Sequence, residues 1–343
     1  MHKKHIYGIT AAILLIIGAI GATNYYQKIF GQSVTQNGAI YIRSNTTITG
    51  LEESLKPFLK DPENFTWLAQ KKKFTTLKGG MYLLKKDMSL NDLVNLLRSG
   101  QQTPIKVTFN NQHTLENLAG RVSQQIEADS ASIVNALLNP NFLSANNLQP
   151  KSVLEICIPN SYEFYWNTSA KKFRDRMLKE YQRFWTPNRL EKAKKIQLTK
   201  SEVTTLASIV QKETAQKKER PMVAGLYLNR LKSHWPLQAD PTIIYILKEK
   251  NGADFMVKRV LNKDLKIDSP YNTYKNKGLP PTLIGMPDIS SIDAVLNPTK
   301  HNYYYMCASI NNIGFHEFAR TLTQHNRNAV KYQRWISKKG INR

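Results

Sequence analysis

The chain has 343 residues, enough for about two domains of roughly 150 residues each. Hydrophobic residues make up 41% of it, which excludes a fully disordered chain. The 49 Lys and Arg outnumber the 25 Asp and Glu and give a formal net charge of +24. This excess favours a polyanionic partner: nucleic acid, anionic lipid or an acidic cell-wall polymer. Charge alone makes nucleic acid the first candidate.

The N-terminal region contains an apolar stretch at residues 6–27 that holds no Asp, Glu, Lys or Arg. About 20 such residues suffice to cross a bilayer, so we predict a transmembrane helix. Lys3 and Lys4 precede the stretch, and the positive-inside rule then places residues 1–5 in the cytoplasm. The alternative is a cleaved signal peptide, for which residues 19–21 offer a small-x-small site.

Either interpretation exports the bulk of the chain, which argues against nucleic acid as the partner. The sequence also lacks a helix-turn-helix, zinc-finger or aromatic ribonucleoprotein signature. The first interpretation predicts a single-pass protein of the cytoplasmic (inner) membrane, with its C-terminal domain on the periplasmic or extracellular side.

Residues 38–102 are expected to form a small α+β module after a polar tether at residues 31–38. Ser89 is typical of a helix N-cap and Gly100 of a helix end. The module has no cluster of acids or histidines, which indicates a binding or spacer role. Its expected elements are a strand at 39–42, helices at 49–59 and 62–71, a strand at 79–84 and a helix at 89–100.

Residues 105–335 are expected to form a larger α+β domain. It begins with an alternating strand at 105–109, and a helix-rich stretch follows at 113–145. The fold class predicted for the whole chain is therefore α+β, with a single-pass N-terminal helix, a small module and a larger domain.

Several common sites are excluded by their missing motifs. The sequence has no Walker loop, no dinucleotide-binding glycine loop and no G-x-S-x-G nucleophile motif. His316-Glu317 begins like a zinc-protease motif, but Arg320 stands where the second histidine is needed. The two cysteines, Cys157 and Cys307, exclude a disulfide scaffold and a four-cysteine zinc site. We expect two buried free thiols, with a disulfide as the alternative in an oxidising compartment.

One carboxylate lies on the apolar face of a predicted helix. Thr199 and Glu202 form a capping box, and apolar residues then recur at helical spacing up to Val210. Glu213 continues that row, and a poorly solvated carboxyl group there can act as a general acid near neutral pH. The alternative is a surface pair between Glu213 and Lys217, one turn apart, and helical position alone favours this alternative.

Polar and aromatic residues downstream have the composition of a glycan cleft, and equally that of structural loops. Asn229 lies near the end of a helix that Pro221 begins, and Asp240 before Pro241 is predicted to be an N-cap. The residues we select as cleft candidates are Asn229, Gln238, Asp240, Tyr271, Asn272 and Tyr274.

These motifs, in this order, resemble the YceG-like (MltG) endolytic murein transglycosylase family. Phe315–Phe318 and His325-Asn326 resemble the family's closing strand and helix. The resemblance covers most of the chain, includes the anchor and suggests a LysM-like character for residues 38–102. The motifs that carry it are Leu206–Glu213, Asn229-Arg230, Leu237–Thr242, Ser269–Tyr274 and Gly278–Pro281.

The resemblance implies cleavage of the β-1,4 bond between N-acetylmuramic acid (MurNAc) and N-acetylglucosamine (GlcNAc) in nascent peptidoglycan strands. The product is a 1,6-anhydroMurNAc end, which would terminate glycan elongation. The resemblance assigns catalysis to Glu213, which acts first as a general acid and then as a general base. It implies no metal, no cofactor and no obligatory second carboxylate. Peptidoglycan strands, the membrane and peptidoglycan synthases are the implied partners.

Two positions depart from the family's pattern. Gln211 stands where many members have a second glutamate, which supports Glu213 as the essential one, and Asn160 replaces an acidic residue. Two alternatives stay open: a hydrolytic muramidase that uses Glu213 with Asp240, and a non-enzymatic, membrane-tethered glycan-binding protein.

Overall fold

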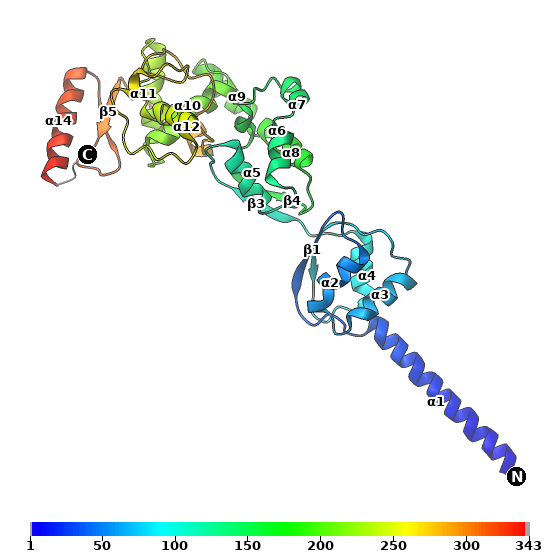
Figure 1. The fold of residues 1–343 in the computed structure, drawn as a ribbon. Coiled ribbons are helices and arrows are strands. Elements are labelled where there is room, and N and C mark those ends of the chain that lie inside the picture. The colour runs from blue at the N-terminus through cyan, green and yellow to red at the C-terminus, as the bar shows by residue number, and fades with distance from the viewer. Residues whose placement is uncertain (1, 340–343) are drawn as a thin grey trace. The chain divides into compact units, whose positions relative to one another are not determined.

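The computed structural model describes residues 2–339 as a mixture of helices and short strands (Figure 1). The chain divides into two compact units. Unit 1 contains the chain up to Val107 and two later segments, Gln124–Ala128 and Tyr162–Ser169. Unit 2 contains Thr108–Ser123, Asp129–Ser161 and the remainder from Ala170.

The N-terminal helix α1 (His2–Phe30) contains the predicted apolar stretch. Its segment His5–Phe30 is 26 residues long, and none of its most apolar window is buried. At 1.5 Å per residue this segment measures about 39 Å, more than the ~30 Å hydrocarbon core of a bilayer. Length and composition are therefore consistent with a single-pass membrane anchor.

The end of α1 is part of unit 1. Ile29 is buried in the hydrophobic core of that unit, and α1 packs against α4. The predicted polar tether at residues 31–38 is wrong, because this segment is folded onto the unit. The backbone amides of Ser33 and Val34 both donate to the carbonyl oxygen of Met88, at 3.1 Å each. The backbone hydrogen bonds of the segment are thus made within unit 1.

Unit 1 has the predicted order of strand, two helices, strand and helix. β1 and β2 pair antiparallel, from Gly38 opposite Leu84 to Ile42 opposite Gly80. Ser89 caps α4 as predicted, accepting a hydrogen bond of 3.1 Å from the amide of Asp92. The elements are α1 (His2–Phe30), β1 (Gly38–Ile42), α2 (Ile48–Leu55), η1 (Lys56–Phe58), α3 (Pro62–Lys71), β2 (Gly80–Leu84) and α4 (Leu90–Ser99).

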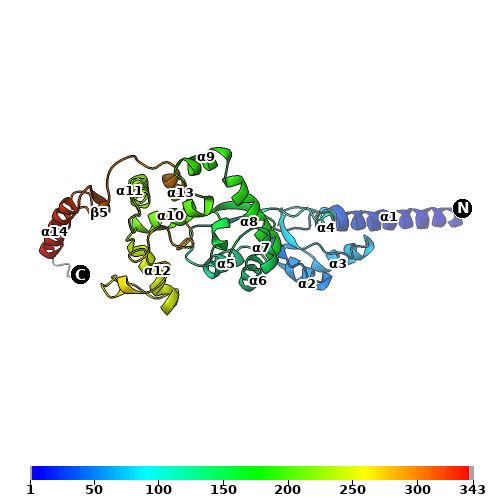
Figure 2. The same ribbon diagram turned by 90° about the horizontal axis from the view of Figure 1, so that it is seen from above.

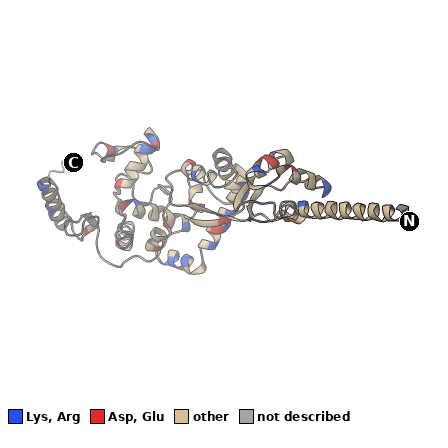
Figure 3. Cartoon of the chain, turned by 90° about the horizontal axis from the view of Figure 1, so that it is seen from below, with Lys and Arg blue, Asp and Glu red and all other residues tan. Residues whose placement is uncertain are grey.

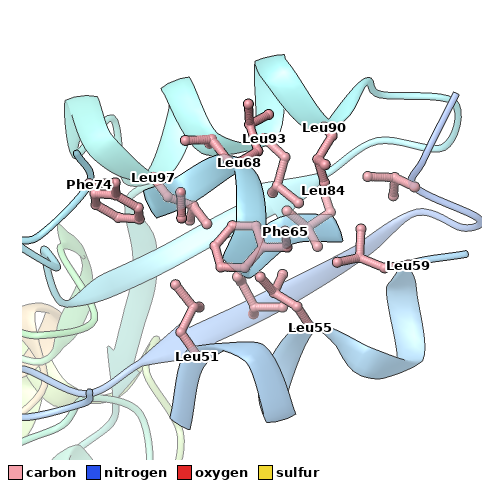
Figure 4. Packing of buried hydrophobic residues seen from close by; sticks show 14 of the residues in the cluster. Leu51, Leu55, Leu59, Phe65, Leu68, Phe74, Leu84, Leu90, Leu93 and Leu97 are labelled. Atoms are coloured by element: carbon pink, nitrogen blue, oxygen red, sulfur yellow. The ribbon is translucent and has the colours of Figure 1, made fainter. Parts of the chain in front are cut away.

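The core of unit 1 lies between this strand pair and the three helices α2, α3 and α4. Figure 4 shows Phe65 of α3 at its centre, between Leu55 of α2 and Leu93 of α4. All three side chains are fully buried, and each such burial stabilises the unit by about 1.5–3 kcal/mol. The apolar stripes of the helices therefore fold this module around one core.

Two segments distant in sequence complete unit 1. The carboxylate of Glu127 accepts hydrogen bonds from the Ser44 amide (2.8 Å) and the Ser44 hydroxyl (2.6 Å). The Asn167 side chain donates to the carbonyl oxygen of Gly79 at 2.9 Å. Unit 1 is consequently larger than the 38–102 module expected from the sequence.

Unit 2 is mainly helical. β3 pairs with β4, and β5 pairs antiparallel with β6. The helices of unit 2 are α5 (Leu115–Ser123), α6 (Ser130–Leu137), α7 (Pro140–Ala145), α8 (Ala170–Phe184), α9 (Pro187–Lys195), α10 (Lys200–Glu213), α11 (Arg220–Lys232), α12 (Asp240–Asn251), α13 (Ile289–Leu296) and α14 (Leu322–Lys338), with short η2 (Val153–Ile156) and η3 (Asp264–Lys266). The strands are β3 (Ile105–Phe109), β4 (Asn160–Phe164), β5 (Tyr305–Ala308) and β6 (His316–Ala319).

Helix α10 is the central element of unit 2. It packs against α11, α12 and α13 (Figure 2), and every residue from Val203 to Val210 is buried. The capping box of Thr199 and Glu202 begins it as predicted. A helix buried on all sides needs its small polar groups satisfied. Accordingly, the Ser208 hydroxyl donates to the Thr205 carbonyl oxygen and accepts from the Ile284 amide.

The C-terminal part of unit 2 consists of the β5–β6 pair and α14, as the resemblance implied. α14 packs against both strands and contains basic residues but no acidic ones. These basic residues are exposed and appear as the blue segments near the C-terminus in Figure 3. They are Arg327, Lys331, Arg334 and Lys338.

Candidate active site

A cavity of about 220 Å³ lies in unit 2, where α10 ends. It is smaller than the ~300 Å³ and more that enclose a drug-sized ligand, so it suits one group of a larger substrate. Helices α10, α11 and α12, the loop before α13 and the β5–β6 pair all contribute to its wall. The lining residues are Glu213, Leu226, Tyr227, Arg230, Gln238, Asp240, Tyr274, Met306, Cys307, Ala308 and His316.

Glu213 is the last residue of α10 and its side chain is half-buried. The predicted surface alternative is wrong, because α10 ends at Glu213 and Lys217 is not one helical turn further along. The carboxylate instead accepts a hydrogen bond of 2.6 Å from the Tyr227 hydroxyl. Burial raises the pKa of Glu213 to about 7, and the charge of Asp240 acts in the same direction. The Tyr227 hydrogen bond and the positive charges of His316 and Arg230 oppose this rise.

Tyr227 is buried on α11, and its hydroxyl group remains protonated. Burial and the neighbouring Glu213 carboxylate raise the pKa of Tyr227 well above its ordinary value. The hydroxyl is therefore a fixed donor to Glu213. A carboxyl group with a pKa near 7 and a fixed donor beside it can both release and recover a proton at neutral pH.

A histidine–glutamate pair lies beside Glu213. The His316 amide donates to Glu219 Oε1 at 2.6 Å, and His316 Nδ1 lies 2.9 Å from Glu219 Oε2. Burial lowers the pKa of His316, but the hydrogen bond and charge of Glu219, together with the charge of Glu213, outweigh burial and raise it. The charge of protonated His316 stabilises ionised Glu213.

Arg230 contributes a second positive charge from α11, three residues after Tyr227. Its guanidinium donates to the carbonyl oxygens of Tyr304, at 2.8 Å, and Leu237. The side chain is buried, and burial lowers the pKa of Arg230 from its ordinary value, which nevertheless leaves the group charged. Arg230 thus holds β5 and the segment before α12 around the cavity.

Asp240 has a different role from the one predicted. α12 begins at Asp240, its N-cap is Ala239, and no side chain caps it. The Asp240 carboxylate instead accepts a hydrogen bond from the Tyr274 hydroxyl. The prediction of an N-cap was wrong because a long-range partner competes successfully for this carboxylate.

The structure brings four of the predicted site residues together: Glu213, Gln238, Asp240 and Tyr274 all line the cavity. Gln238 has a positive φ of 49°. This conformation is strained for a residue with a side chain, and it is held by a 3.0 Å hydrogen bond from the Gln238 amide to the Thr273 carbonyl oxygen.

The other three predicted residues are not in the cavity and have structural partners. Asn272 is fully buried, and its amide group donates to the carbonyl oxygens of Leu265 (3.0 Å) and Ile267 (2.7 Å). The Tyr271 hydroxyl is 2.7 Å from that of Thr282. The Asn229 amide donates to the carbonyl oxygens of His301 (2.8 Å) and Tyr303 (3.1 Å). Direct substrate contact by these residues is therefore not supported.

Sequence reasoning missed three groups at the cavity. Tyr227 and Arg230 are three residues apart, a spacing that places them on one face of α11. The sequence analysis named Arg230 only within a family motif and gave neither residue a role at the site. His316 belongs to an incomplete zinc motif and to the predicted closing strand, and neither feature indicated a place at the site.

Within residues 2–339, no group of three or more His, Cys, Asp or Glu side chains is placed to hold a metal ion. Cys157 and Cys307 are free thiols; Cys157 is buried, whereas Cys307 is half-buried on the cavity wall. The expectation that both are buried was therefore correct only for Cys157.

Comparison with known proteins gives consistent results. The YceG-like family model matches residues 40–331. An endolytic murein transglycosylase of Bacillus subtilis is 30% identical over 311 residues, which cover 85% of this chain and 84% of that protein. An endolytic murein transglycosylase of Streptococcus pneumoniae is 27% identical and is matched over 66% of its own length. A crystal structure of a protein described as YceG-like, from Listeria monocytogenes, aligns with a TM-score of 0.56 at 27% identity, over 85% of this chain and 98% of that one.

Proposed function

Because this chain belongs to the YceG-like family, we propose that it is a membrane-anchored lytic transglycosylase of peptidoglycan, a lyase. The curated relatives bear the name endolytic murein transglycosylase, which supports this activity and an endolytic mode of cleavage. The observation that carries the proposal is the half-buried Glu213, whose pKa is raised to about 7, at the wall of a cavity.

We assign the bond and the products from the resemblance to the YceG-like family, and a single carboxyl group of this kind can perform the chemistry. Protonated Glu213 donates its proton to the oxygen that links MurNAc C1 to GlcNAc, and that C1–O bond breaks. The ionised carboxylate then accepts the proton of the MurNAc 6-hydroxyl while the oxygen of that hydroxyl forms a bond to C1. The products are a 1,6-anhydroMurNAc end and a new GlcNAc end. No water is consumed, and Glu213 returns to its protonated form.

The neighbours of Glu213 fit this cycle. The Tyr227 hydrogen bond stabilises the carboxylate between the two proton transfers, and so do the charges of His316 and Arg230. We assign Gln238, Asp240 and Tyr274 to holding the sugar. Asn229, Tyr271 and Asn272 support the cavity from behind. The exposed ring of Trp235, which packs on Tyr304 and Tyr305 beside β5, offers an aromatic face of the kind that sugars stack on.

A hydrolytic muramidase is the second candidate, because Asp240 provides another carboxylate in the same cavity as Glu213. In that mechanism Asp240 would activate a water molecule, and the product would have a reducing end. The hydrogen bond from Tyr274 to Asp240 occupies one of its oxygens and favours a binding role instead.

The remaining parts of the chain are assigned on the same basis. α1 is the membrane anchor, and we place residues 1–5 in the cytoplasm and the chain after α1 on the other side. Residues 38–102 form a LysM-like module and residues 105–335 the catalytic domain. Peptidoglycan synthases at the growing wall are the proposed partners, and co-purification with the full-length chain tests this assignment.

Product analysis tests the activity. The purified full-length chain in detergent is incubated with nascent glycan strands, and the products are identified by mass spectrometry. Ends one water lighter than reducing ends support the lyase. Reducing ends identify the hydrolase, and an absence of cleavage identifies a glycan-binding protein. Glu213→Gln should abolish cleavage, while the matched variant Glu191→Gln, which alters an exposed carboxylate on α9, should retain it.

A further inference from the structure

Unit 2 contains a second, larger cavity of about 520 Å³, which the proposed chemistry does not use. The two cavities share helices α10 and α12. On α10, Lys212 lines the larger cavity and the next residue, Glu213, lines the smaller one. On α12, Asp240 lies in the smaller cavity and Lys248 lies two turns further along, in the larger one.

The larger cavity has an excess of positive charge. Lys212 Nζ is 3.0 Å from His113 Nδ1, so its nearest partner is a neutral imidazole rather than an anion. Lys248 is half-buried, and its side-chain ammonium group makes no hydrogen bond or ion pair with any residue in the described range 2–339. Two further charges cancel, because Lys151 pairs with Glu249 at 2.9 Å. The one other acid in the wall, Glu116, is exposed.

These cations destabilise one another in the absence of a ligand. Burial lowers the pKa of Lys212 and the charge of Lys248 lowers it further, while the charge of Asp288 opposes both without reversing the shift. Burial and the charges of both lysines likewise lower the pKa of His113. A bound anion would relieve this repulsion and pair with Lys248, so the cavity favours an anionic ligand.

The other residues of the cavity wall indicate the kind of ligand to which the anionic group is attached. The wall also contains aliphatic side chains, including Leu138, Val153, Ile244 and Leu283. Such a surface favours a ligand whose anionic group is attached to a small apolar body. A short peptide with methyl side chains and free carboxylates has this combination.

The spacing along α12 connects this ligand to the reacting sugar. Eight residues separate Asp240 from Lys248, a rise of about 12 Å at 1.5 Å per residue. An extended peptide covers that distance with about four residues. Muramyl sugars carry a peptide of about this length, so a strand that places its sugar at Glu213 can reach the lysines with its peptide.

We propose that this cavity binds the stem peptide of the glycan strand and that Lys212 and Lys248 receive a peptide carboxylate. The inference rests on the proposed function, since that function supplies the peptide-bearing substrate. By this proposal the protein recognises both the stem peptide and the glycan of its substrate.

A binding experiment tests the site independently of cleavage. The full-length chain carrying Glu213→Gln, in detergent, is titrated with two strand preparations of equal length, one with stem peptides and one from which they have been removed. Removing the peptide should lower affinity about tenfold or more, as expected for one charge-assisted contact. After addition of Lys248→Gln, peptide removal should have little effect. The matched variant Lys250→Gln, on the same helix but outside the cavity, should behave like the parent.

The outcomes separate this inference from the proposed function. Equal affinity for the two preparations, or an equal loss in the Lys248 and Lys250 variants, overturns the site even if the wild-type chain cleaves strands. Peptide-dependent binding that requires Lys248 supports the site even if the wild-type chain cleaves nothing. Competition by inorganic phosphate at matched ionic strength, together with indifference to the peptide, would assign the lysines to a phosphate group and overturn the peptide.

Discussion

The hydroxyl group of Tyr227 sets the pH at which Glu213 changes its protonation state, and Tyr227→Phe tests this directly. The hydroxyl donates to the carboxylate at 2.6 Å and lowers a pKa that burial otherwise raises. A hydrogen bond to a charged group contributes about 1.5–3 kcal/mol, and 1.36 kcal/mol corresponds to one pKa unit. We therefore expect the pKa of Glu213 to move from about 7 to roughly one or two pH units higher in the variant.

The measurement is kcat/KM for the formation of anhydro ends between pH 5 and pH 10. The first step requires protonated Glu213, so activity should fall as pH rises through the pKa of this group. In Tyr227→Phe the alkaline limb should lie about one to two pH units higher than in the wild type.

Tyr271→Phe is the matched control, because it removes a buried hydroxyl that pairs with Thr282 outside the cavity. Its alkaline limb should coincide with that of the wild type. An alkaline limb that stays in place, or moves to lower pH, in Tyr227→Phe would refute the assignment of the limb to Glu213. Thermal unfolding of both variants verifies that the fold is retained.

Three further results are expected. Glu213→Gln should lower kcat by at least about 10²-fold. A carboxyl group whose pKa is raised from 4.5 to about 7 lowers the stability of the fold as pH rises through that interval. The variant should therefore be more stable than the wild type at pH 8 by up to about 3 kcal/mol and equal to it at pH 4. Glu219→Gln should destabilise the protein most near pH 6, since His316 is charged below its raised pKa and Glu219 is ionised above its lowered pKa. The thermal unfolding midpoints of variant and wild type should converge as pH rises through the pKa of His316. A difference between the midpoints that is constant with pH would contradict the ion pair. Phe65→Ala should destabilise unit 1 by about 3–5 kcal/mol through the cavity it leaves, measured by chemical unfolding against an exposed control, Tyr41→Ala.

Local rules predicted much of the fold. The capping box of Thr199 and Glu202 begins α10, and the helix at residues 62–71 and the strand at 105–109 have the predicted bounds. These features depend on neighbours within a few residues, which a single sequence displays. The prediction of a polar tether at residues 31–38 was wrong because the hydrogen-bond partners of this segment, such as Met88, are distant in sequence.

The site was predictable only in part, for the same reason. Glu213 continues an apolar row, so its burial was visible in the spacing. The composition of the loop suggested a cleft, but whether an amide faces a substrate or a carbonyl group of its own backbone depends on tertiary packing. Asn272 is the clearest case, since both hydrogen bonds that its side-chain NH₂ group donates are to carbonyl oxygens five to seven residues away. Tyr227 joins Glu213 only because α11 packs against α10.

In the membrane-anchored protein that we propose, the continuity of α1 with the core of unit 1 couples bilayer thickness to the orientation of unit 1. Ile29 is buried in that core, and residues 31–34 fold onto the unit, so no flexible joint separates the apolar helix from unit 1. A helix longer than the hydrocarbon core relieves the hydrophobic mismatch by tilting. Any tilt of α1 is then also a rotation of unit 1. In membranes of different thickness, unit 1 should present a different surface to the lipid headgroups.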